Sequence, residues 1–176
     1  MTYHLKMQIR KCTPDDAPLL ACIVTDTWQT AYNGILPDNL IDAESLKSRR
    51  EHLCFYFGRG LGNRWFESFL LTVGNTPAGC FTVCQSKDPD AGADMAELLS
   101  IYILAESRYA GHGTKCMNFM TTHLKEQGYK KLAVWMLYNN LSTITFFEKH
   151  GFTPDGMTRN VVLGDGLQDH RYVKGL

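Results

Sequence analysis

The stretch best suited to binding a charged ligand is a short glycine-containing turn, Arg108-Tyr109-Ala110-Gly111-His112-Gly113-Thr114. An apolar run rich in β-branched residues precedes it at 101–104, and apolar residues recur at helical spacing after it as far as Gly128. The pattern predicts a strand, a turn and the N-terminus of a helix. The first turn of a helix has backbone N–H groups without intrahelical partners, and the helix dipole adds partial positive charge there. Since glycine has no Cβ to hinder a phosphate, we expect this turn to bind an anion.

A tight strand-to-helix connection that binds nothing would show the same short turn. The turn also lacks the Gly-Lys-Ser/Thr ending of a P-loop and the GxGxxG of a dinucleotide-binding fold. A nucleotide-phosphate site of another kind would need a metal-binding hydroxyl or acid near the glycines, and Thr114 alone offers one. We expect no metal site, because the cysteines and histidines have no metal-ligand spacing.

Strands are expected on both sides of this turn along the chain. Alternation of apolar and polar residues indicates a half-buried strand, and a short continuous apolar run indicates a buried one. The expected strands are Leu5–Lys11, Trp65–Val73, Ala78–Gln85, Asp94–Leu104, Lys131–Leu137, Val161–Leu163 leading into the hairpin turn Gly164-Asp165-Gly166, and Gln168–Val173.

Helices are expected between these strands. They run from the N-cap Thr13 to Tyr32, from Ala43 to Phe57, from the glycine turn to Gly128, and from Leu141 to His150. The second of them has one apolar side. Its other side is basic and polar, and we interpret it as a solvated face made of Lys47, Arg49, Arg50 and Glu51.

The order of these elements is β, α, α, β, β, β, α, β, α, β, β, which is typical of a twisted mixed sheet with helices on its faces. The sequence has no internal repeat, low-complexity tract or linker. Residues 1–176 are therefore expected to form a single domain of the α/β (α+β) class.

Composition excludes several classes of protein. The 18 basic residues balance the 18 acidic ones, so no basic stripe favours nucleic acid. No apolar run reaches membrane-spanning length, and the first residues have no apolar core of a secretory signal, so no membrane contact is expected. The six cysteines form no CxxC pair and sit mostly among apolar neighbours, which favours reduced thiols in a cytoplasmic protein.

Several motifs resemble one protein family. Arg108, Gly111 and Gly113 are similar to the Arg/Gln-x-x-Gly-x-Gly/Ala pyrophosphate signature of the GNAT superfamily of acyl-CoA-dependent N-acetyltransferases. The segment from Asn140 to Phe152 is similar to its Asn…Phe-Tyr-Glu-Lys…Gly-Phe segment, and Trp28 to Pro37 resembles a segment of one branch. The resemblance implies the GNAT fold, a mixed, twisted, mostly antiparallel sheet of about seven strands with helices on both faces, splayed between its two central parallel strands.

The resemblance also implies a site for acetyl-CoA. Backbone N–H groups of the glycine turn would hold the pyrophosphate, with Arg108, Gly111 and Gly113 the matching positions. Backbone N–H groups of the preceding strand would polarise the thioester. The other cofactor-binding residues expected on this basis are Tyr109, Ala110, His112, Thr114, Ile101, Ile103, Asn140 and Phe147.

Acetyl transfer to an amine also needs a proton acceptor, and Glu97 is the candidate. An amine with a pKa of ~10.4 is almost wholly protonated at pH 7, and freeing its lone pair costs ~4.6 kcal/mol. Glu97 shares a strand face with Ile101 and Ile103 and precedes Arg108 by eleven residues, the offset of the general base in some GNAT enzymes. A structural salt bridge at Glu97, deprotonation through water and a role for Asp94 remain open alternatives.

The leaving thiolate lacks its usual proton donor. Phe147 occupies the position of the tyrosine that serves in many relatives, and phenylalanine has no proton to give. Water or Tyr138 is expected to serve instead. Tyr102 is also nearby in the expected fold, and either tyrosine could simply pack.

The acceptor is expected near Trp28, Tyr32 and Asn33, which lie at the end of the first helix. The aromatic pair could hold a cation, or could belong to the core. Isolated histidines are expected at the surface or in turns: His112, His150 and His170.

These residues predict an N-acetyltransferase that moves an acetyl group from acetyl-CoA to a primary amine of a small molecule or a protein. The alternative is a catalytically weak acyl-CoA-binding sensor, which Phe147 favours. A homodimer is an open possibility because many GNAT proteins dimerise. The identity of the amine is beyond the sequence.

Overall fold

The computed structural model describes residues 6–61, 66–161 and 166–176. The α-helices in these ranges are α1 (Ala17–Ala31), α2 (Ala43–Gly60), α3 (His112–Glu126) and α4 (Leu141–Lys149). Short 3-10 turns occur at Pro14–Asp16, Asp38–Leu40 and Ala105–Ser107. The strands are β1 (Met7–Lys11), β2 (Phe66–Val73), β3 (Thr76–Gln85), β4 (Met95–Ile103), β5 (Lys131–Leu137), β6 (Thr153–Asn160) and β7 (Gln168–Gly175).

The seven strands form one sheet in the order β1-β2-β3-β4-β5-β7-β6. β1 is antiparallel to β2, and β7 is antiparallel to both of its neighbours. β4 and β5 are parallel, with their pairing running from Met95↔Lys131 to Leu98↔Val134, while β4 itself continues to Ile103. This confirms the predicted mixed α/β sheet with a central parallel pair.

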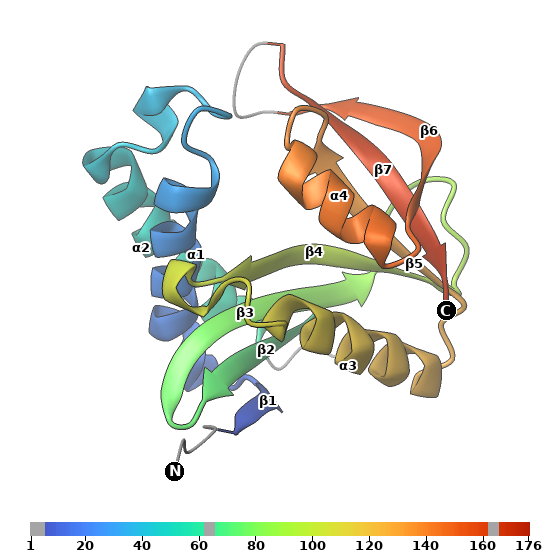
Figure 1. The fold of residues 1–176 in the computed structure, drawn as a ribbon, viewed down its shortest axis with the longest axis horizontal. Helices are drawn as coiled ribbons and strands as arrows, with labels where there is room; N and C mark the ends of the chain where they lie inside the picture. The colour runs from blue at the N-terminus through green and yellow to red at the C-terminus, as the bar shows by residue number, and fades with distance from the viewer. Residues whose placement is uncertain (1–5, 62–65, 162–165) are drawn as a thin grey trace. The chain divides into compact units, whose positions relative to one another are not determined.

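The chain divides into two compact units, and the first comprises residues 1–82 and 100–116. Here α1 packs beside α2 (Figure 1). α1 buries a stripe that includes Leu20, Ile23, Val24 and Trp28. Asp42 is the N-cap of α2, because its side chain accepts a hydrogen bond from the Ser45 N–H at 2.8 Å. The single-domain expectation stays a prediction.

The second unit comprises residues 83–99 and 117–176. Figure 1 shows α4 lying over the strands β5 and β7 of this unit. Phe147 of α4 and Phe152, which follows it, are both 1% exposed, and their rings meet edge-on at 5.1 Å. Burial of this aromatic pair holds α4 against the sheet.

The sequence analysis did not predict the strand β6 at Thr153–Asn160. Residues 162 and 163 of the strand expected at Val161–Leu163 lie outside the described residues. All eight residues of β6 are exposed, and β6 lies beside β7 at the edge of the sheet. An exposed edge strand containing Pro154 and Gly156 has no apolar alternation for a sequence pattern to detect. Residues 162–165 of the predicted hairpin, and Leu5 and Trp65 of two predicted strands, lie outside the described residues.

All six cysteines are free. Burial raises the pKa of Cys12 and Cys116 to about 12, which makes both poor nucleophiles. In the described part of the chain no helix is long and apolar enough to cross a membrane.

Candidate functional site

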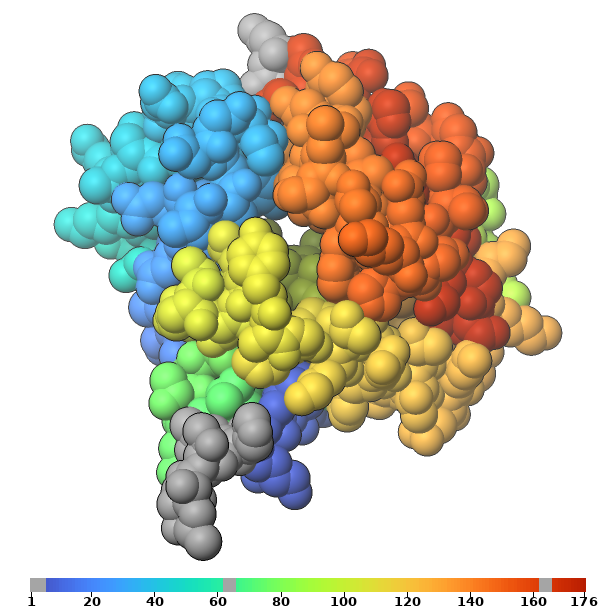
Figure 2. All heavy atoms as spheres, viewed as in Figure 1, coloured from blue at the N-terminus to red at the C-terminus, as the bar shows by residue number. Residues whose placement is uncertain are grey.

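The glycine turn joins the end of β4 to the start of α3. After the 3-10 turn at Ala105–Ser107, Tyr109 and Gly111 both take left-handed conformations, with φ of 60° and 76°. Such a φ is strained for tyrosine and easy for glycine. A Cβ built on Gly111 would meet nothing within 4 Å, and the Tyr109 side chain is fully exposed. Figure 2 shows this turn, in yellow, at the molecular surface. The turn is therefore open to a ligand at Gly111.

Arg108 fixes the turn to its surroundings in the first unit. Its Nε donates to the Ile103 carbonyl at 3.0 Å, and its Nη2 donates to Thr30 Oγ1 at 2.9 Å. His112 Nδ1 donates to the Ser107 carbonyl at 3.0 Å, which fixes the neutral ring's tautomer because a carbonyl can only accept. The side chains of Arg108 and His112 thus hold the backbone of the turn in place.

The N-terminus of α3 follows directly. The Lys115 N–H donates to the Gly111 carbonyl at 3.1 Å, which closes the first turn of the helix. Backbone N–H groups that precede such a bond, here those of His112 and Gly113, have no partner within a helix. With the helix dipole they form the kind of site that binds phosphate.

Glu97 lies in β4 opposite Ala133 of β5, within the second unit. Its side chain is buried, at 7% exposure. Burial and then the negative charge of Asp88 raise its pKa, while Arg159, Arg171 and a hydrogen bond from Ser86 oppose the rise. A buried carboxyl with a raised pKa is a candidate general base. Asp94, the other candidate, is half-buried just before β4, and its backbone carbonyl accepts hydrogen bonds from the N–H groups of Lys130 and Lys131.

A charged network that the sequence did not reveal surrounds Asp88 in the same unit. Arg171 of β7 is 3% exposed and donates to Asp88, Asp90 and Asp155. Trp135 Nε1 also donates to Asp88, at 3.1 Å. Arg171 and Asp88 are 83 positions apart in the chain, so no sequence spacing could have paired them.

The remaining predicted residues of this unit have structural contacts of their own. Tyr138 is 48% exposed, with its ring 6.1 Å from that of His170. Asn140 is buried and caps α4, because its Oδ1 accepts from the Thr143 N–H at 3.3 Å. Phe147 lies in the aromatic core beside Phe152. The roles of Asn140 and Phe147 toward a cofactor stay predictions.

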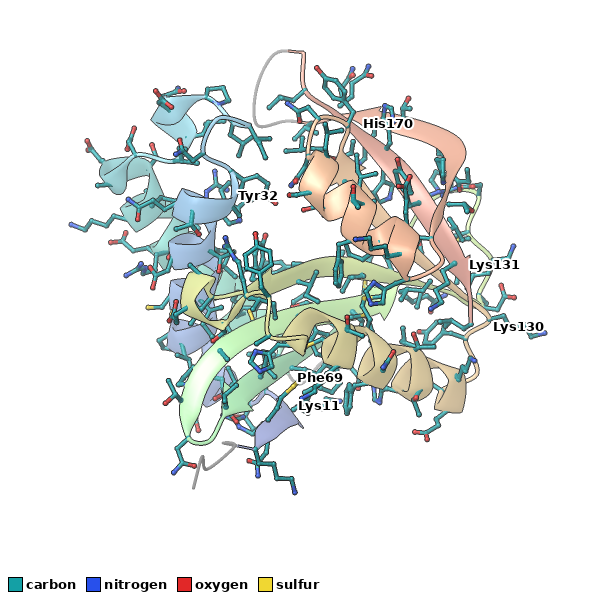
Figure 3. All side chains as sticks on the ribbon, viewed as in Figure 1. Lys11, Tyr32, Phe69, Lys130, Lys131 and His170 are labelled. Atoms are coloured by element: carbon teal, nitrogen blue, oxygen red, sulfur yellow. The ribbon has the colours of Figure 1, made fainter. Side chains whose placement is uncertain are left out.

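The predicted acceptor residues lie at the end of α1, in the first unit. Trp28 is 8% exposed, its Nε1 donates to the Tyr102 hydroxyl at 3.0 Å, and its ring meets that of Tyr32 edge-on at 5.0 Å. Burial raises the pKa of Tyr102 well above its ordinary value, with Tyr32 adding to the rise. Figure 3 shows Tyr32 at the C-terminal end of α1, and the next residue, Asn33, is exposed. Trp28 is therefore part of a packed cluster.

The structure corrects one expectation about α2, because Arg49 is not a solvated side chain. We expected a solvated face, but the Arg49 guanidinium is half-buried and lies 4.1 Å from the centroid of the Trp28 ring. Its neighbour Arg50 also turns toward α1, where its Nε donates to Thr25 Oγ1 at 2.9 Å. The sequence does contain a signal for this. Leu46 is a buried residue of α2, and Arg49 and Arg50 follow it at i+3 and i+4, on the same side of the helix.

Each unit thus brings together part of the predicted set. The first gathers Arg108, Gly111 and the end of β4, together with the cluster of Trp28 and Tyr32. The second holds Glu97 beside Asp88. Within the described ranges, no group of three His, Cys, Asp or Glu residues could hold a metal ion.

Comparison with known proteins identifies the family. A family model described as the acetyltransferase (GNAT) family matches residues 27–152. That is more than half of the chain, so the chain belongs to the GNAT acetyltransferase family. A search of proteins with curated functions gives no significant match.

Solved structures show the same fold. The PaiA N-acetyltransferase of Thermoplasma acidophilum, solved in complex with coenzyme A, has a TM-score of 0.76 and 19% identity, covering 97% of this chain and 99% of that one. An acetyltransferase from Thermus thermophilus has a TM-score of 0.71 and 21% identity, covering 98% and 99%. An N-acetyltransferase from Staphylococcus aureus has a TM-score of 0.68 and 17% identity, covering 97% and 98%.

Proposed function

We propose that this protein transfers an acetyl group from acetyl-CoA to a primary amine, by direct attack of the amine within a ternary complex. The observation that carries the proposal is the turn from Arg108 to Gly113. It combines a left-handed glycine that is open to a ligand, a side chain that fixes the backbone, and a helix N-terminus directly behind.

The donor follows from the chemistry of that turn and from the family. Coenzyme A has a pyrophosphate, and backbone N–H groups at a helix N-terminus suit its negative charge. The coenzyme A bound in the PaiA N-acetyltransferase structure supports the same ligand here. We assign the pyrophosphate to the N–H groups of residues 111–113, and the thioester carbonyl to the backbone N–H groups of Ile101 and Ile103.

Glu97 is the proposed base. The amine nitrogen attacks the thioester carbon, the carbon–sulfur bond breaks, the electron pair of that bond leaves on the sulfur, and the proton of the amine passes to the Glu97 carboxylate directly or through water. Burial and Asp88 raise the pKa of Glu97 above that of an ordinary carboxyl. A carboxylate with a raised pKa is a stronger base and takes a proton more readily.

The thiolate must then be protonated without help from the usual position. Phe147 is buried and carries no proton donor. A coenzyme A thiol with a pKa near ~8.5 is a tolerable leaving group near neutral pH, so water or the partly exposed Tyr138 suffices.

The second candidate function is an acyl-CoA-binding sensor with weak catalysis, and the observation that favours it is the same Phe147. The two functions share the acetyl-CoA site and differ in turnover. The cytoplasmic location and the homodimer stay predictions.

An amine screen tests the proposal. Purified protein is incubated with acetyl-CoA and a panel of primary amines, thiol release is followed with a colorimetric reagent, and products are identified by mass spectrometry. We expect thiol release that depends on one class of amine, with the acetylated amine as product. Acetyl-CoA binding without amine-dependent release would favour the sensor, and absence of both would refute both functions.

A further inference from the structure

Among the described residues, Arg49 has no charged partner. Its guanidinium lies over the Trp28 ring, and its Nε is enclosed by protein with no hydrogen-bond partner. Across the described ranges, no acidic side chain forms an ion pair with Arg49. The adjacent Arg50 is a contrast, because it pairs with Asp26 and bonds to Thr25.

Such an arrangement is costly in the absence of a ligand. A guanidinium has five N–H donors in a fixed fork, and an enclosed charge is unfavourable unless an anion or hydrogen-bond acceptor compensates it. The Trp28 ring supplies part of the compensation through its π face but accepts no ordinary hydrogen bond. Burial lowers the pKa of Arg49, and the interaction with Tyr102 partly offsets this decrease. The direction of the shift indicates that burial disfavours the charged form of Arg49. The Trp28 ring holds the guanidinium in position. Because Nε is enclosed by protein, a ligand can meet only the Nη groups of the fork.

A surface hollow runs along α2, and Arg49 is one of the residues that line it. It has a volume of about 490 Å³ and follows one stripe of α2, with Arg49 in its wall. Ser48, His52 and Tyr56 also line it at successive turns of the helix, and each has a polar atom that can bind an oxyanion. Glu44 lines the same hollow and limits its total positive charge. The hollow can therefore hold a small ligand with one negative charge.

The fork is connected to the strand that we expect to contact the thioester. Arg49 packs on Trp28, whose Nε1 donates to the Tyr102 hydroxyl at 3.0 Å. Tyr102 lies between Ile101 and Ile103 in β4. All of these residues belong to the first unit. A ligand held by Arg49 would thus be anchored to the cluster that packs directly on this strand.

We propose that Arg49 binds a carboxylate of the acceptor, so that the acceptor is an amine that also carries a carboxylate. This inference rests on the proposed function. A carboxylate matches the two parallel donors of a guanidinium fork. A phosphate would bring a second negative charge toward Glu44, with no second arginine in the wall of the hollow to balance it. The Arg49 guanidinium also covers the face of Trp28 that a cationic acceptor would need. This favours an acceptor with an anionic group at this position.

Paired acceptors test the proposal. Each proteinogenic amino acid is compared with its own carboxamide in the thiol-release assay. Because the α-amine of the carboxamide is the less basic of the two, kcat/KM is calculated on the concentration of neutral amine. We expect kcat/KM to favour the acid over the amide by about 10- to 100-fold, the range for a hydrogen bond to a charged group. Arg49→Met should reduce this ratio to near one, and Arg49→Lys should leave an intermediate ratio. Lys47→Met, which removes an exposed charge from the same helix, should leave the ratio unchanged.

Three results of that assay would overturn the proposal: no preference for the acid, transfer only to amines without a carboxylate, or an unchanged ratio in Arg49→Met. Circular dichroism confirms that each variant is folded, and the ratio within one variant is independent of its active fraction.

A second measurement does not depend on turnover. The ¹⁵N signal of the Arg49 Nε–H is followed by NMR while N-acetylglycine, a product-like carboxylate, is added in the presence of coenzyme A. We expect a saturable shift that N-acetylglycinamide does not cause, and no shift for either compound would reject the carboxylate site. Failure to bind acetyl-CoA, measured by calorimetry, would instead reject the proposed function, so the two failures are distinguishable.

Discussion

Arg171 Nη1 donates to Asp88 Oδ2 at 2.9 Å, and this bond ties β7 to the loop that precedes β4 in the second unit. The same Asp88 oxygen accepts from Trp135 Nε1, so it has two donors. The charge of Asp88 helps to raise the pKa of Glu97. The Arg171–Asp88 pair therefore fixes the position of a charge that acts on the candidate base.

Replacing Glu97 by glutamine tests its role as the base. Glu97→Gln should bind acetyl-CoA with unchanged affinity and reduce kcat by about 100-fold or more, within the usual contribution of a general base. The loss should shrink as pH rises, because more of the amine is then already neutral. Steady-state rates from about pH 6 to 10 measure this effect. Equal pH–rate profiles for wild type and variant would show that Glu97 does not take the proton.

Asp88→Asn should shift the acidic limb of the wild-type rate profile to lower pH. The Asp88 charge raises the pKa of Glu97, so its removal lets Glu97 ionise at lower pH and act as a base there. Asp90→Asn is the matched control, because Asp90 also bonds to Arg171 but is not among the charges that shift Glu97. An identical shift in both variants would mean that loss of the Arg171 contact, and not the charge beside Glu97, moves the limb.

Arg171→Met should destabilise the fold by about 3 kcal/mol, because it leaves carboxylates without their buried counterion. Arg159→Met is the control. The Arg159 guanidinium lies over the Trp135 ring, 4.3 Å from its centroid, and pairs with Asp169, but the Arg159 side chain is 49% exposed. An exposed pair is worth less than about 1 kcal/mol. Urea denaturation gives the free energy of unfolding of both variants. Equal losses would show that burial of Arg171 is not the source of its contribution.

The sequence predicted elements whose local pattern agrees with their environment. The apolar run of β4 and the glycine turn after it predicted the strand, the turn and α3. Apolar runs and glycines are local features of the sequence, so they can be recognised without knowing the fold. The edge strand β6 was not predicted, because it has no buried face and therefore no apolar pattern. The contacts of Arg49 and Arg171 could not be predicted from the sequence, because their partners are distant in the chain. Arg49 contacts Trp28, and Arg171 contacts Asp88.

The predicted site divides in the same way. Arg108 and Gly111 were identified from their spacing, and the structure shows what each one does. Arg108 anchors the turn through its side chain, and Gly111 leaves the turn open because it has no side chain. Glu97 was chosen from its strand face, but its raised pKa depends on burial and on Asp88, which only the fold brings near. The sequence predicted that the aromatic ring of Trp28 could bind a cationic acceptor. In the structure the Arg49 guanidinium lies over that ring.

Calorimetric titration of wild type and Gly111→Glu with acetyl-CoA tests the central claim most directly. A Cβ at Gly111 meets nothing within 4 Å, so the substitution costs only the strain of a left-handed φ, about 1–2 kcal/mol. The variant should therefore fold while its carboxylate and bulk repel the pyrophosphate. Gly128→Glu is the control, since Gly128 also has a positive φ and open space but lies at the other end of α3. We predict that wild type and Gly128→Glu bind acetyl-CoA but neither ATP nor NAD, and that Gly111→Glu does not bind it. Equal affinity of all three proteins for acetyl-CoA would contradict the assignment of the turn, and no binding by wild type would contradict the proposed function.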